Sequence, residues 1–360
     1  MKLALFRHKS PLLLGIDISS SSVKLLELSQ SPQGYRIESY AIEHLPADAI
    51  RETEIKNVEA VGVAINHVVQ RSHAHSKLAA IAVTGSGVIT KVIQMNSLLS
   101  DSEIASQIQL EAERYIPYPL SEVNIDFQVL GPSNKNPDFV DVLLAASRTE
   151  MIDTLVEVLN IGGLTTKVVG IEVYAIERAF GLIAEQLPSE GEHQTIAVIV
   201  LGATSMTLCV LHDRTTVYTR EQIFGGKQLT EEIQRRYGLT YEEAELAKKQ
   251  GGLPDDYMTE VLDPFKDAVV QQVSRALQFF FSSSEFSEID HIVLSGGTAS
   301  LLGLVRRVEE KLGIPTTVAN PFSNMSVAPR VSVGALHLDA PSLLVCCGLA
   351  LRSFINDHQY

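Results

Sequence analysis

The chain has 360 residues, of which 45% are hydrophobic and 20% are charged, with a formal net charge of −14 and a pI near 5.2. This length predicts two domains, and the composition is typical of a soluble globular protein. The acidic balance argues against nucleic-acid binding, which needs a basic surface to meet the phosphates. The three cysteines, two of them adjacent at Cys346 and Cys347, form no disulfide framework and favour a reducing compartment.

The N-terminal segment, residues 1–18, is predicted to be a cytoplasmic start. Its basic residues interrupt the apolar run, which argues against a secretory signal peptide. No apolar run approaches the roughly 18 residues that a membrane span requires. Leu3, Leu5 and Phe6 leave open whether this segment touches a membrane surface or a partner.

Residues 12–28, LLLGIDISSSSVKLLEL, predict a β-hairpin with a polar turn between two apolar strands. The turn consists of four serines, Ser19, Ser20, Ser21 and Ser22. Their backbone N–H groups and hydroxyls suit phosphate oxygens. Asp17 at the end of the first strand suits a hydrated Mg²⁺ ion, which keeps most of its waters, while Lys24 leaves on the second strand. The alternative is an ordinary edge hairpin with a serine turn.

Residues 197–211, AVIVLGATSMTLCVL, repeat this hairpin without a gap. The second turn contains Gly202, Ala203, Thr204 and Ser205 in place of the four serines. Two copies of one hairpin predict two similar halves that face a shared cleft. The repeat has one important departure, because Val200 stands where the counterpart of Asp17 is expected.

Between the two hairpins, the first half continues with strand 35–45, helix 58–71 and strand 79–83. The pattern then predicts a strand, a helix, two strands and a helix at residues 89–95, 99–114, 122–130, 139–146 and 150–160. This α+β unit, residues 89–166, looks inserted into the first domain, either to offer a groove or as structural bulk. Strand 167–171 follows and leads into helix 172–186, which places Glu172 just past the strand end.

The second half follows a polar linker at residues 190–194. After strand 216–220, a helix opens at Gly225, Gly226 and Lys227, and a helix N-terminus behind glycines brings backbone N–H groups close to an anion.

The next helix carries Glu245 and Lys248 on one face, and the longest helix covers residues 257–283. Near residue 290 a strand runs into Gly296 and Gly297 and then into a helix, so that the backbone can lie flat against a ligand. An apolar helix at residues 342–354 closes the chain.

These loops and the internal duplication resemble the actin-like ATPase superfamily, in which two matching hairpins hold the phosphates of ATP. The resemblance implies an α/β fold with two duplicated domains around a nucleotide cleft, with ATP and Mg²⁺ as cofactors and Asp17 holding the metal through water. The implied nucleotide-binding residues are the four serines, Lys24, Gly202, Ala203, Thr204, Gly225, Gly226, Lys227, Glu245, Lys248, Gly296, Gly297 and Thr298.

Within this superfamily the chain is similar to the PilM family of the type IV pilus assembly platform. Stretches such as EAERYIPYPLSEV, YTREQIFGGKQLTEEIQRRYGL and AELAKKQGGLPDDY carry the resemblance, which covers essentially the whole chain. It implies a first actin-like domain at residues 1–88 and 167–190, with helix 341–356 packed back on it. It also implies an FtsA-like inserted subdomain at 89–166 and a second actin-like domain at 191–340.

The same resemblance implies a cytoplasmic ATP-binding scaffold that lies at the inner membrane and takes part in twitching motility. Its implied partner is the N-terminal cytoplasmic tail of PilN, bound in a groove beside residues 89–166 by main-chain hydrogen bonds and apolar anchors. PilO is implied as an indirect partner, and PilB and PilT as candidate motor partners.

Two departures from the family pattern concern hydrolysis. Relatives commonly have Asp where this chain has Val200 and where it has Gly170. Hydrolysis needs a group that orients the attacking water and helps hold the metal, and valine does neither. Glu172 is the candidate that partly substitutes, so binding is expected with weak or absent turnover. The alternatives are an active ATPase or phosphotransferase, a filament-forming protein and a nucleotide-free interaction module.

Overall fold

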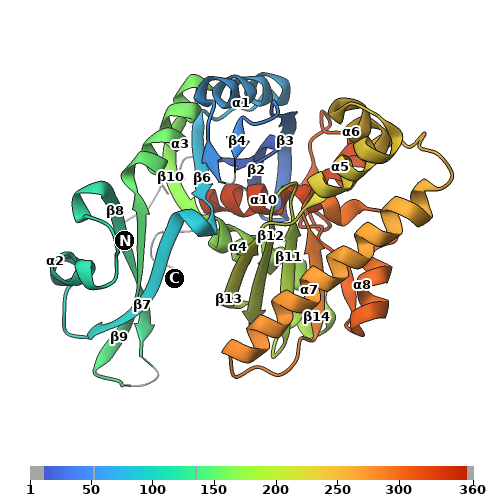
Figure 1. Cartoon of the computed structure of the whole chain (residues 1–360). Helices are drawn as coiled ribbons and strands as arrows, with labels where there is room; N and C mark the ends of the chain where they lie inside the picture. The colour runs from blue at the N-terminus through green and yellow to red at the C-terminus, as the bar shows by residue number, and fades with distance from the viewer. Residues whose placement is uncertain (1–11, 52, 134–135, 355–360) are drawn as a thin grey trace.

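The computed structural model describes residues 12–51, 53–133 and 136–354. The N-terminal side chains predicted to touch a membrane or a partner lie outside the described residues. Two domains, each built on one mixed sheet, lie side by side, and a smaller sheet unit projects from the first (Figure 1). The strand orders are β10-β6-β1-β2-β3-β16 in the first domain and β13-β12-β11-β14-β15 in the second.

The first sheet carries helices on both faces. Its strands are β1 (Leu14–Ser19), β2 (Ser22–Ser31), β3 (Gly34–His44), β6 (Leu78–Val83), β10 (Thr165–Ile171) and β16 (Ser326–Val327), with the short pair β4 (Ile50–Arg51) and β5 (Glu54–Ile55) nearby. One face is covered by α1 (Val58–Ser72) and α3 (Thr149–Ile161), and the other by α4 (Glu172–Ala184) and α10 (Leu344–Ala350). Alternate residues of β2 serve the two faces, since Leu25 packs toward α1 and Leu26 toward α4.

One face of the second sheet packs against helices of its own domain, and the other face joins the core around α4 and α10 of the first domain. Its strands are β11 (Thr195–Leu201), β12 (Met206–His212), β13 (Thr215–Gln222), β14 (His291–Ser295) and β15 (Thr316–Val318). Its helices are α5 (Gly226–Tyr237), α6 (Tyr241–Gln250), α7 (Asp263–Ser283) and α8 (Leu304–Leu312). A π-helical turn at Met258–Leu262 precedes α7, so the helix predicted at 257–283 begins with a wider turn.

The two predicted hairpins have the same register, as the gapless repeat requires. Asp17 pairs with Lys24 across β1 and β2, and Val200 pairs with Thr207 across β11 and β12. The predicted hairpins are therefore confirmed, and Val200 occupies the place that Asp17 occupies in the first copy.

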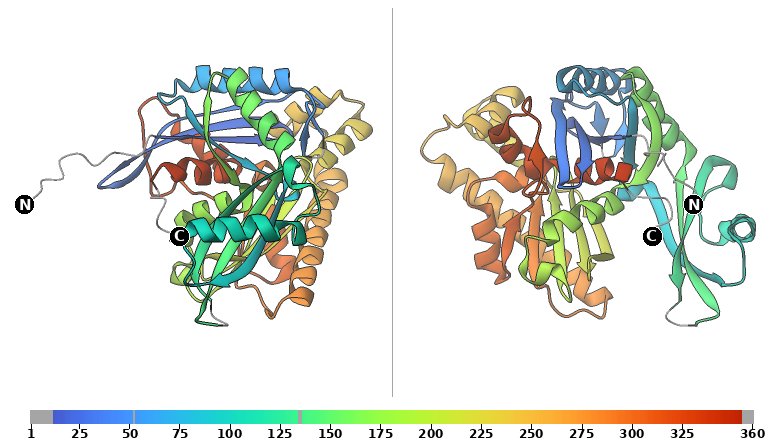
Figure 2. Two further views of the ribbon diagram at one scale, coloured as in Figure 1. Left: turned by 90° about the vertical axis from the view of Figure 1, so that its left-hand side faces the viewer. Right: turned by 180° about the vertical axis from the view of Figure 1, so that it is seen from behind.

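The projecting unit has a core of its own. It contains β7 (Val88–Asn96), α2 (Asp101–Glu111), β8 (Val123–Pro132) and β9 (Phe139–Arg148), with the strand order β7-β9-β8. Ile93, Ile104 and Leu144 belong to its buried cluster. Ser100 and Glu103 form a capping box at the start of α2. Seen from behind, the unit lies to one side of the first domain (Figure 2).

The predicted end of this insertion at residue 166 is too late. Helix α3 packs against α1, and Leu155, Val158 and Leu159 are buried in the core of the first domain. The apolar stripe of α3 therefore belongs to the first domain, and the independently packed unit ends with β9.

The predicted end of the second domain at residue 340 is also too late. β16 pairs with β3 of the first sheet, and Arg330 donates to the Glu38 carbonyl oxygen at 2.8 Å. The chain has thus returned to the first domain before α9 (Val333–Asp339). The C-terminal helix α10 contacts α4 and β1 of the first domain.

One helical stretch in the described part of the chain, Val333–Phe354, is long and apolar enough to cross a membrane by length and composition alone. The sequence reading did not single it out. In the fold, 61% of its most apolar window is buried, and most of α10 packs against the first sheet and α4. The stretch therefore serves as a core element here.

We predict that Gly62→Ala destabilises the first domain. A Cβ atom on Gly62 would lie 2.3 Å from Ile161 Cγ2, so α1 and α3 would have to move apart. Such overpacking costs about 1–3 kcal/mol in the free energy of unfolding, measurable by chemical denaturation.

The matched control is Gly181→Ala in α4, where a new Cβ meets no atom within 4 Å. This change should be neutral or should stabilise by about 0.5–1 kcal/mol, because alanine favours the helix. Equal effects at both positions would contradict the close contact of α1 and α3.

Candidate functional site

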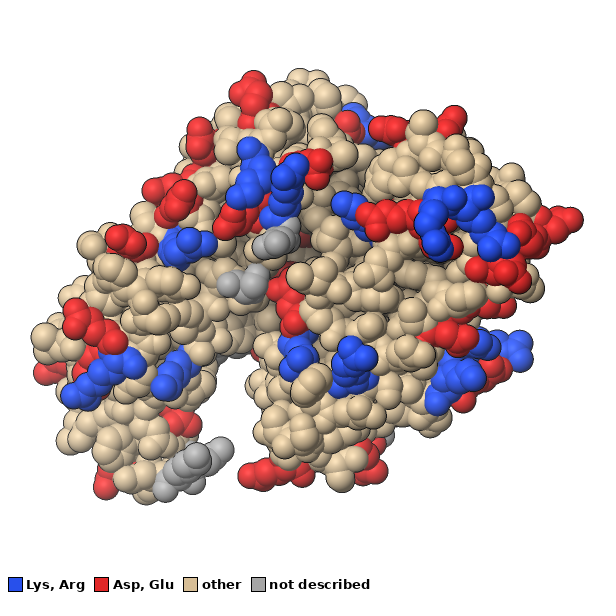
Figure 3. All heavy atoms as spheres, viewed as in Figure 1, with Lys and Arg blue, Asp and Glu red and all other residues tan. Residues whose placement is uncertain are grey.

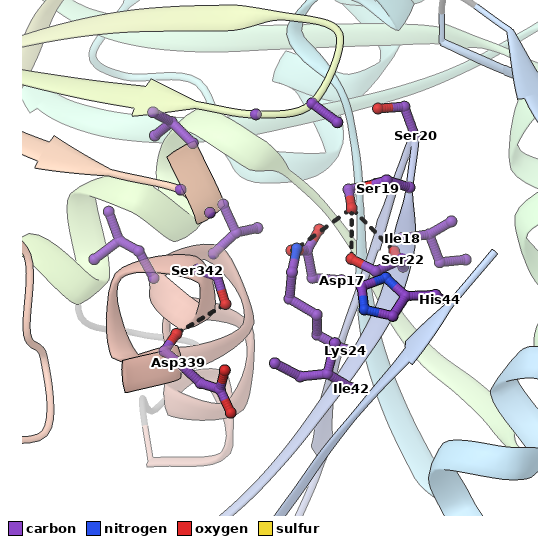
Figure 4. Close-up of a pocket in the computed structure, with 18 of the residues that line it drawn as sticks. Asp17, Ile18, Ser19, Ser20, Ser22, Lys24, Ile42, His44, Asp339 and Ser342 are labelled. Atoms are coloured by element: carbon purple, nitrogen blue, oxygen red, sulfur yellow. Dashed lines mark hydrogen bonds and ion pairs between the residues drawn. The ribbon is translucent and has the colours of Figure 1, made fainter. Parts of the chain in front are cut away.

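A cavity of about 1030 Å³ lies between the two domains and is lined by both hairpins. Its size is at the upper end of the range for small-molecule and cofactor sites. Figure 4 shows Asp17, Ser19, Ser22 and Lys24 from the first hairpin on one side of it. The space-filling view shows Lys and Arg interspersed with Asp and Glu around this part of the surface (Figure 3).

The first turn is held by a network of side chains. Lys24 Nζ donates to Asp17 Oδ2 at 2.7 Å and to Ser19 Oγ at 3.4 Å. Ser19 Oγ in turn donates to the Ser22 carbonyl oxygen at 3.0 Å. The Asp17 and Lys24 side chains are only 15% and 11% exposed, so the ion pair is fixed at the cavity wall.

The second turn is held by backbone contacts instead. The N–H groups of Gly226 and Lys227 donate to the carbonyl oxygens of Gly202 and Ala203 at 3.0 and 2.8 Å. Because these two N–H groups already donate to the turn, the start of α5 positions the second turn, and neither group is free to meet an anion in this arrangement. Thr298 Oγ1 donates to the Gly202 carbonyl oxygen at 2.9 Å and holds the same turn.

The two turns touch across the cavity. Thr204 Oγ1 donates to Ser20 Oγ at 2.8 Å. Gly296 packs behind the second hairpin with φ +86°, and a Cβ there would lie 2.3 Å from the Leu201 carbonyl oxygen. Only glycine combines this backbone conformation with so close an approach.

The polar residues of α6 form the far end of the cavity. Lys248 Nζ donates to Thr230 Oγ1 at 2.7 Å, and Glu245 accepts from both Lys248 and Thr230. The expected shared face of Glu245 and Lys248 is therefore confirmed. Burial and the neighbouring Lys249 lower the pKa of Lys248, although Glu245 opposes this shift.

Most of the predicted residues come together at this cavity. Those that line it are Asp17, Ser19, Ser20, Ser21, Ser22, Lys24, Glu172, Gly202, Ala203, Thr204, Gly226, Glu245, Lys248, Gly296, Gly297 and Thr298. Gly225 and Lys227 do not line it. Lys227 is half-exposed on α5 beside Glu231, and Gly225 packs against the Ala203 carbonyl.

Sequence reasoning missed several residues that line the cavity. Glu221 and Thr207 come from the second sheet, and His44 and Lys249 contact each other across the domains at 3.0 Å. Their positions follow from strand pairing and domain packing, and no local motif marks them. The hairpin register could have identified Thr207, because it faces Val200 as Lys24 faces Asp17.

Glu172 is the first residue of α4 and lines the cavity. Burial raises the pKa of its carboxyl group to about 8, and the negative charges of Asp17 and Glu221 add to this while Lys24 opposes it. The carboxyl group is therefore mostly protonated at neutral pH, and it can donate a hydrogen bond.

The residues present suit a nucleotide with a hydrated metal ion. The described chain contains no group of three or more His, Cys, Asp or Glu side chains that could hold a metal ion directly. A metal held through water fits the single first-turn carboxylate, as the sequence predicts for Asp17. Among the described residues, Glu221 Oε2 is buried without a hydrogen-bond partner, as expected of a group whose partner is a water or a ligand.

Comparison with solved structures defines the class of fold. A structure described as the PilM-PilN type IV pilus biogenesis complex aligns with a TM-score of 0.80 and 26% identity over 96% of this chain and 100% of that chain. EutJ from Carboxydothermus hydrogenoformans, an ethanolamine utilization protein, aligns with a TM-score of 0.55 and 14% identity over 95% and 90% of the two chains. A diol dehydratase-reactivating factor in nucleotide-free form aligns with a TM-score of 0.53 and 12% identity over 95% of this chain and 99% of that chain. The chain has the actin-like ATPase fold.

The family is defined more narrowly by sequence. The family described as type IV pilus assembly protein PilM matches residues 15–354. The chain belongs to the PilM family, as its sequence predicts.

We predict that Glu172→Gln changes how stability depends on pH. Because the pKa of Glu172 is raised in the folded protein, its protonated carboxyl group stabilises the folded state. This stability is fully present below about pH 4.5 and is lost as the pH rises through about 8. A glutamine stays neutral, so the melting temperature of this variant should fall less between about pH 6 and about pH 9 than that of the wild type. Thermal unfolding across this range measures the difference.

Glu59→Gln serves as the control, because Glu59 is exposed on α1, remote from the cavity. It should keep the wild-type pH dependence. Parallel curves for wild type and Glu172→Gln would mean that Glu172 ionises normally.

Proposed function

We propose that this protein is an ATP-binding scaffold of type IV pilus assembly that binds the N-terminal cytoplasmic tail of PilN. The observation that carries the nucleotide part is the approach of two equivalent hairpin turns to one cavity. The partner part is supported by family membership and by the likeness to the PilM-PilN complex.

ATP would lie with its phosphates between the two turns. Lys24 and the serine hydroxyls of the first turn offer donors to the phosphate oxygens, and Thr204 offers one from the second turn. Asp17 would hold Mg²⁺ through water, and the ion would neutralise phosphate charge. Glu245 and Lys248 at the far end provide polar partners for the ribose. Phosphates entering between the turns would replace the contact of Thr204 with Ser20.

Turnover would be slow. Val200 lines the cavity at the place equivalent to Asp17, and an apolar side chain neither orients water nor helps hold a metal. Removal of one such group costs on the order of 10²-fold in rate in other enzymes. The protein would therefore act mainly through binding, and an active phosphotransferase is the less favoured alternative.

The PilN tail would bind where the projecting unit meets the first domain. A small pocket of about 60 Å³ lies there, with Val88, Ile116 and Tyr118 among its lining residues. β7 and β8 are the edge strands of the projecting sheet, and an edge strand can accept an extended peptide through main-chain hydrogen bonds. Figure 3 also shows an open notch between this unit and the second domain, which leaves room for a chain.

This partner would place the protein at the cytoplasmic face of the inner membrane. PilN binding would bring it indirectly to PilO, and PilB and PilT are candidate contacts toward the pilus motor. Through these contacts the scaffold would contribute to twitching motility.

We predict that Asp17→Asn weakens Mg-ATP binding by about tenfold or more, because a neutral amide is a poorer partner for metal-bound water than a carboxylate. Isothermal titration calorimetry measures the affinity. Asp153→Asn, an exposed change on α3, should bind as the wild type does. An absence of heat with wild-type protein at millimolar Mg-ATP would refute the nucleotide part of the proposal.

We predict that Tyr118→Ala weakens binding of a synthetic PilN tail peptide by about tenfold or more, since a central aromatic anchor contributes strongly to a peptide site. Tyr118 is 45% exposed at the small pocket. Fluorescence anisotropy with the labelled peptide measures the affinity, and thermal unfolding checks that the variant is folded.

Leu98→Ala is the control, because Leu98 is 90% exposed in the same unit and does not line the pocket. It should leave the peptide affinity unchanged. Unchanged binding by a folded Tyr118→Ala variant would place the peptide elsewhere.

A further inference from the structure

Four side chains form a row across the second sheet. Glu221 on β13 pairs with Thr207 on β12, Thr207 pairs with Val200 on β11, and Val200 pairs with Ser295 on β14. Directly paired residues place their side chains on the same face of a sheet. All four line the cavity, so the row faces the space between the two turns.

Within this row Glu221 is the only carboxylate. Neighbouring strands are about 4.8 Å apart, so Glu221 starts about 10 Å from Val200. Thr207 between them has a short side chain, and all three residues line the cavity. A glutamate side chain is long enough to approach, along the row, the space that an aspartate at position 200 would enter.

One oxygen of the Glu221 carboxyl group lacks a hydrogen-bond partner in the described part of the chain. Its Oε2 atom is buried and has no hydrogen-bond partner among the described residues. The adjacent Arg220 does not supply one, because its guanidinium group lies over the Phe279 ring, 3.8 Å from the centroid. A buried carboxylate oxygen without a partner is costly, so this group would gain from accepting a hydrogen bond when the cavity is occupied.

The surroundings place this carboxylate near the first turn. Asp17, Glu172 and Glu221 all line the cavity, and the negative charges of Asp17 and Glu221 both raise the pKa of Glu172, so the three acidic groups lie near one another. Lys24 is paired with Asp17. Glu172 holds a proton at neutral pH, which makes it a poor acceptor for water.

We propose that Glu221 is the water-orienting carboxylate of this site and supplies from β13 the group that β11 lacks at Val200. This inference rests on the proposed function, because it needs ATP between the two turns. The water oxygen forms a bond to the γ-phosphorus as the bond from that phosphorus to the bridging oxygen breaks. The bridging electron pair stays on ADP, and a water proton passes to the released phosphate. Glu221 accepts a hydrogen bond from the water throughout.

The test compares Glu221→Gln with wild type in three measurements. Mg-ATP affinity by calorimetry should change less than threefold, since Glu221 touches the attacking water and not the nucleotide. Steady-state phosphate release should fall by about 100-fold. Binding of ADP with Mg²⁺ and aluminium fluoride, which mimics the transition state, should weaken by at least tenfold. Glu288→Gln, an exposed loop change in the same domain, should alter none of these.

A rescue experiment separates this role from a structural one. The double variant Val200→Asp with Glu221→Gln returns a carboxylate to the row from the neighbouring strand, and it should recover at least tenfold in phosphate release over Glu221→Gln. Failure of wild-type protein to bind Mg-ATP would defeat the proposed function itself. If the wild-type protein binds Mg-ATP, either of two results would overturn the role of Glu221 and leave the proposed function intact. The first is undetectable turnover by the wild-type protein. The second is a Glu221→Gln variant that keeps wild-type turnover and wild-type affinity for the transition-state mimic.

Discussion

The close approach of two hairpin turns is the contact on which the site depends. Ser20 and Thr204 meet at 2.8 Å, although 184 positions separate them in the chain. The second turn can reach this position because the start of α5 and Thr298 hold its carbonyl groups from behind. The first turn is held from within by Lys24 and Asp17. The cavity between the domains is thus bounded by one turn with a charged pair and by one uncharged turn.

This difference in charge has a consequence for chemistry. In the first hairpin the paired positions hold an aspartate and a lysine, and in the second they hold a valine and a threonine. The second hairpin therefore contributes shape and backbone groups without a carboxylate. Acidic side chains still reach the cavity from outside the duplicated hairpins, as Glu172 from α4 and Glu221 from β13. The fold retains carboxylates at the cavity, but on different elements from those that the repeat would give.

The sequence predicts the features that the repeated hairpins determine, and it does not predict those that depend on contacts between distant elements. Both hairpins, and the meeting of their two turns at one cavity, could be predicted, because a gapless repeat fixes strand register and turn position together. The packing of α3 could not be predicted, because helical periodicity shows only that Leu155 and Val158 share an apolar stripe. It does not show whether that stripe packs against the projecting unit or against the first domain. The return of β16 to the first sheet depends on a two-residue pairing that leaves no pattern. Glu221 was missed because its neighbours in the row come from other strands.

The point at which the projecting unit ends, after β9, bears on whether peptide binding and nucleotide binding can be coupled. β9 runs directly into α3, which packs in the first domain, and β10 then leads to Glu172 at the cavity. A peptide bound where the unit joins the first domain would therefore contact the start of a continuous set of packed elements that ends at the nucleotide cleft. Coupling between the sites requires that these elements have two arrangements that each ligand favours differently. Any such coupling is reciprocal, so a nucleotide that tightens peptide binding is itself bound more tightly, by the same factor, when the peptide is present.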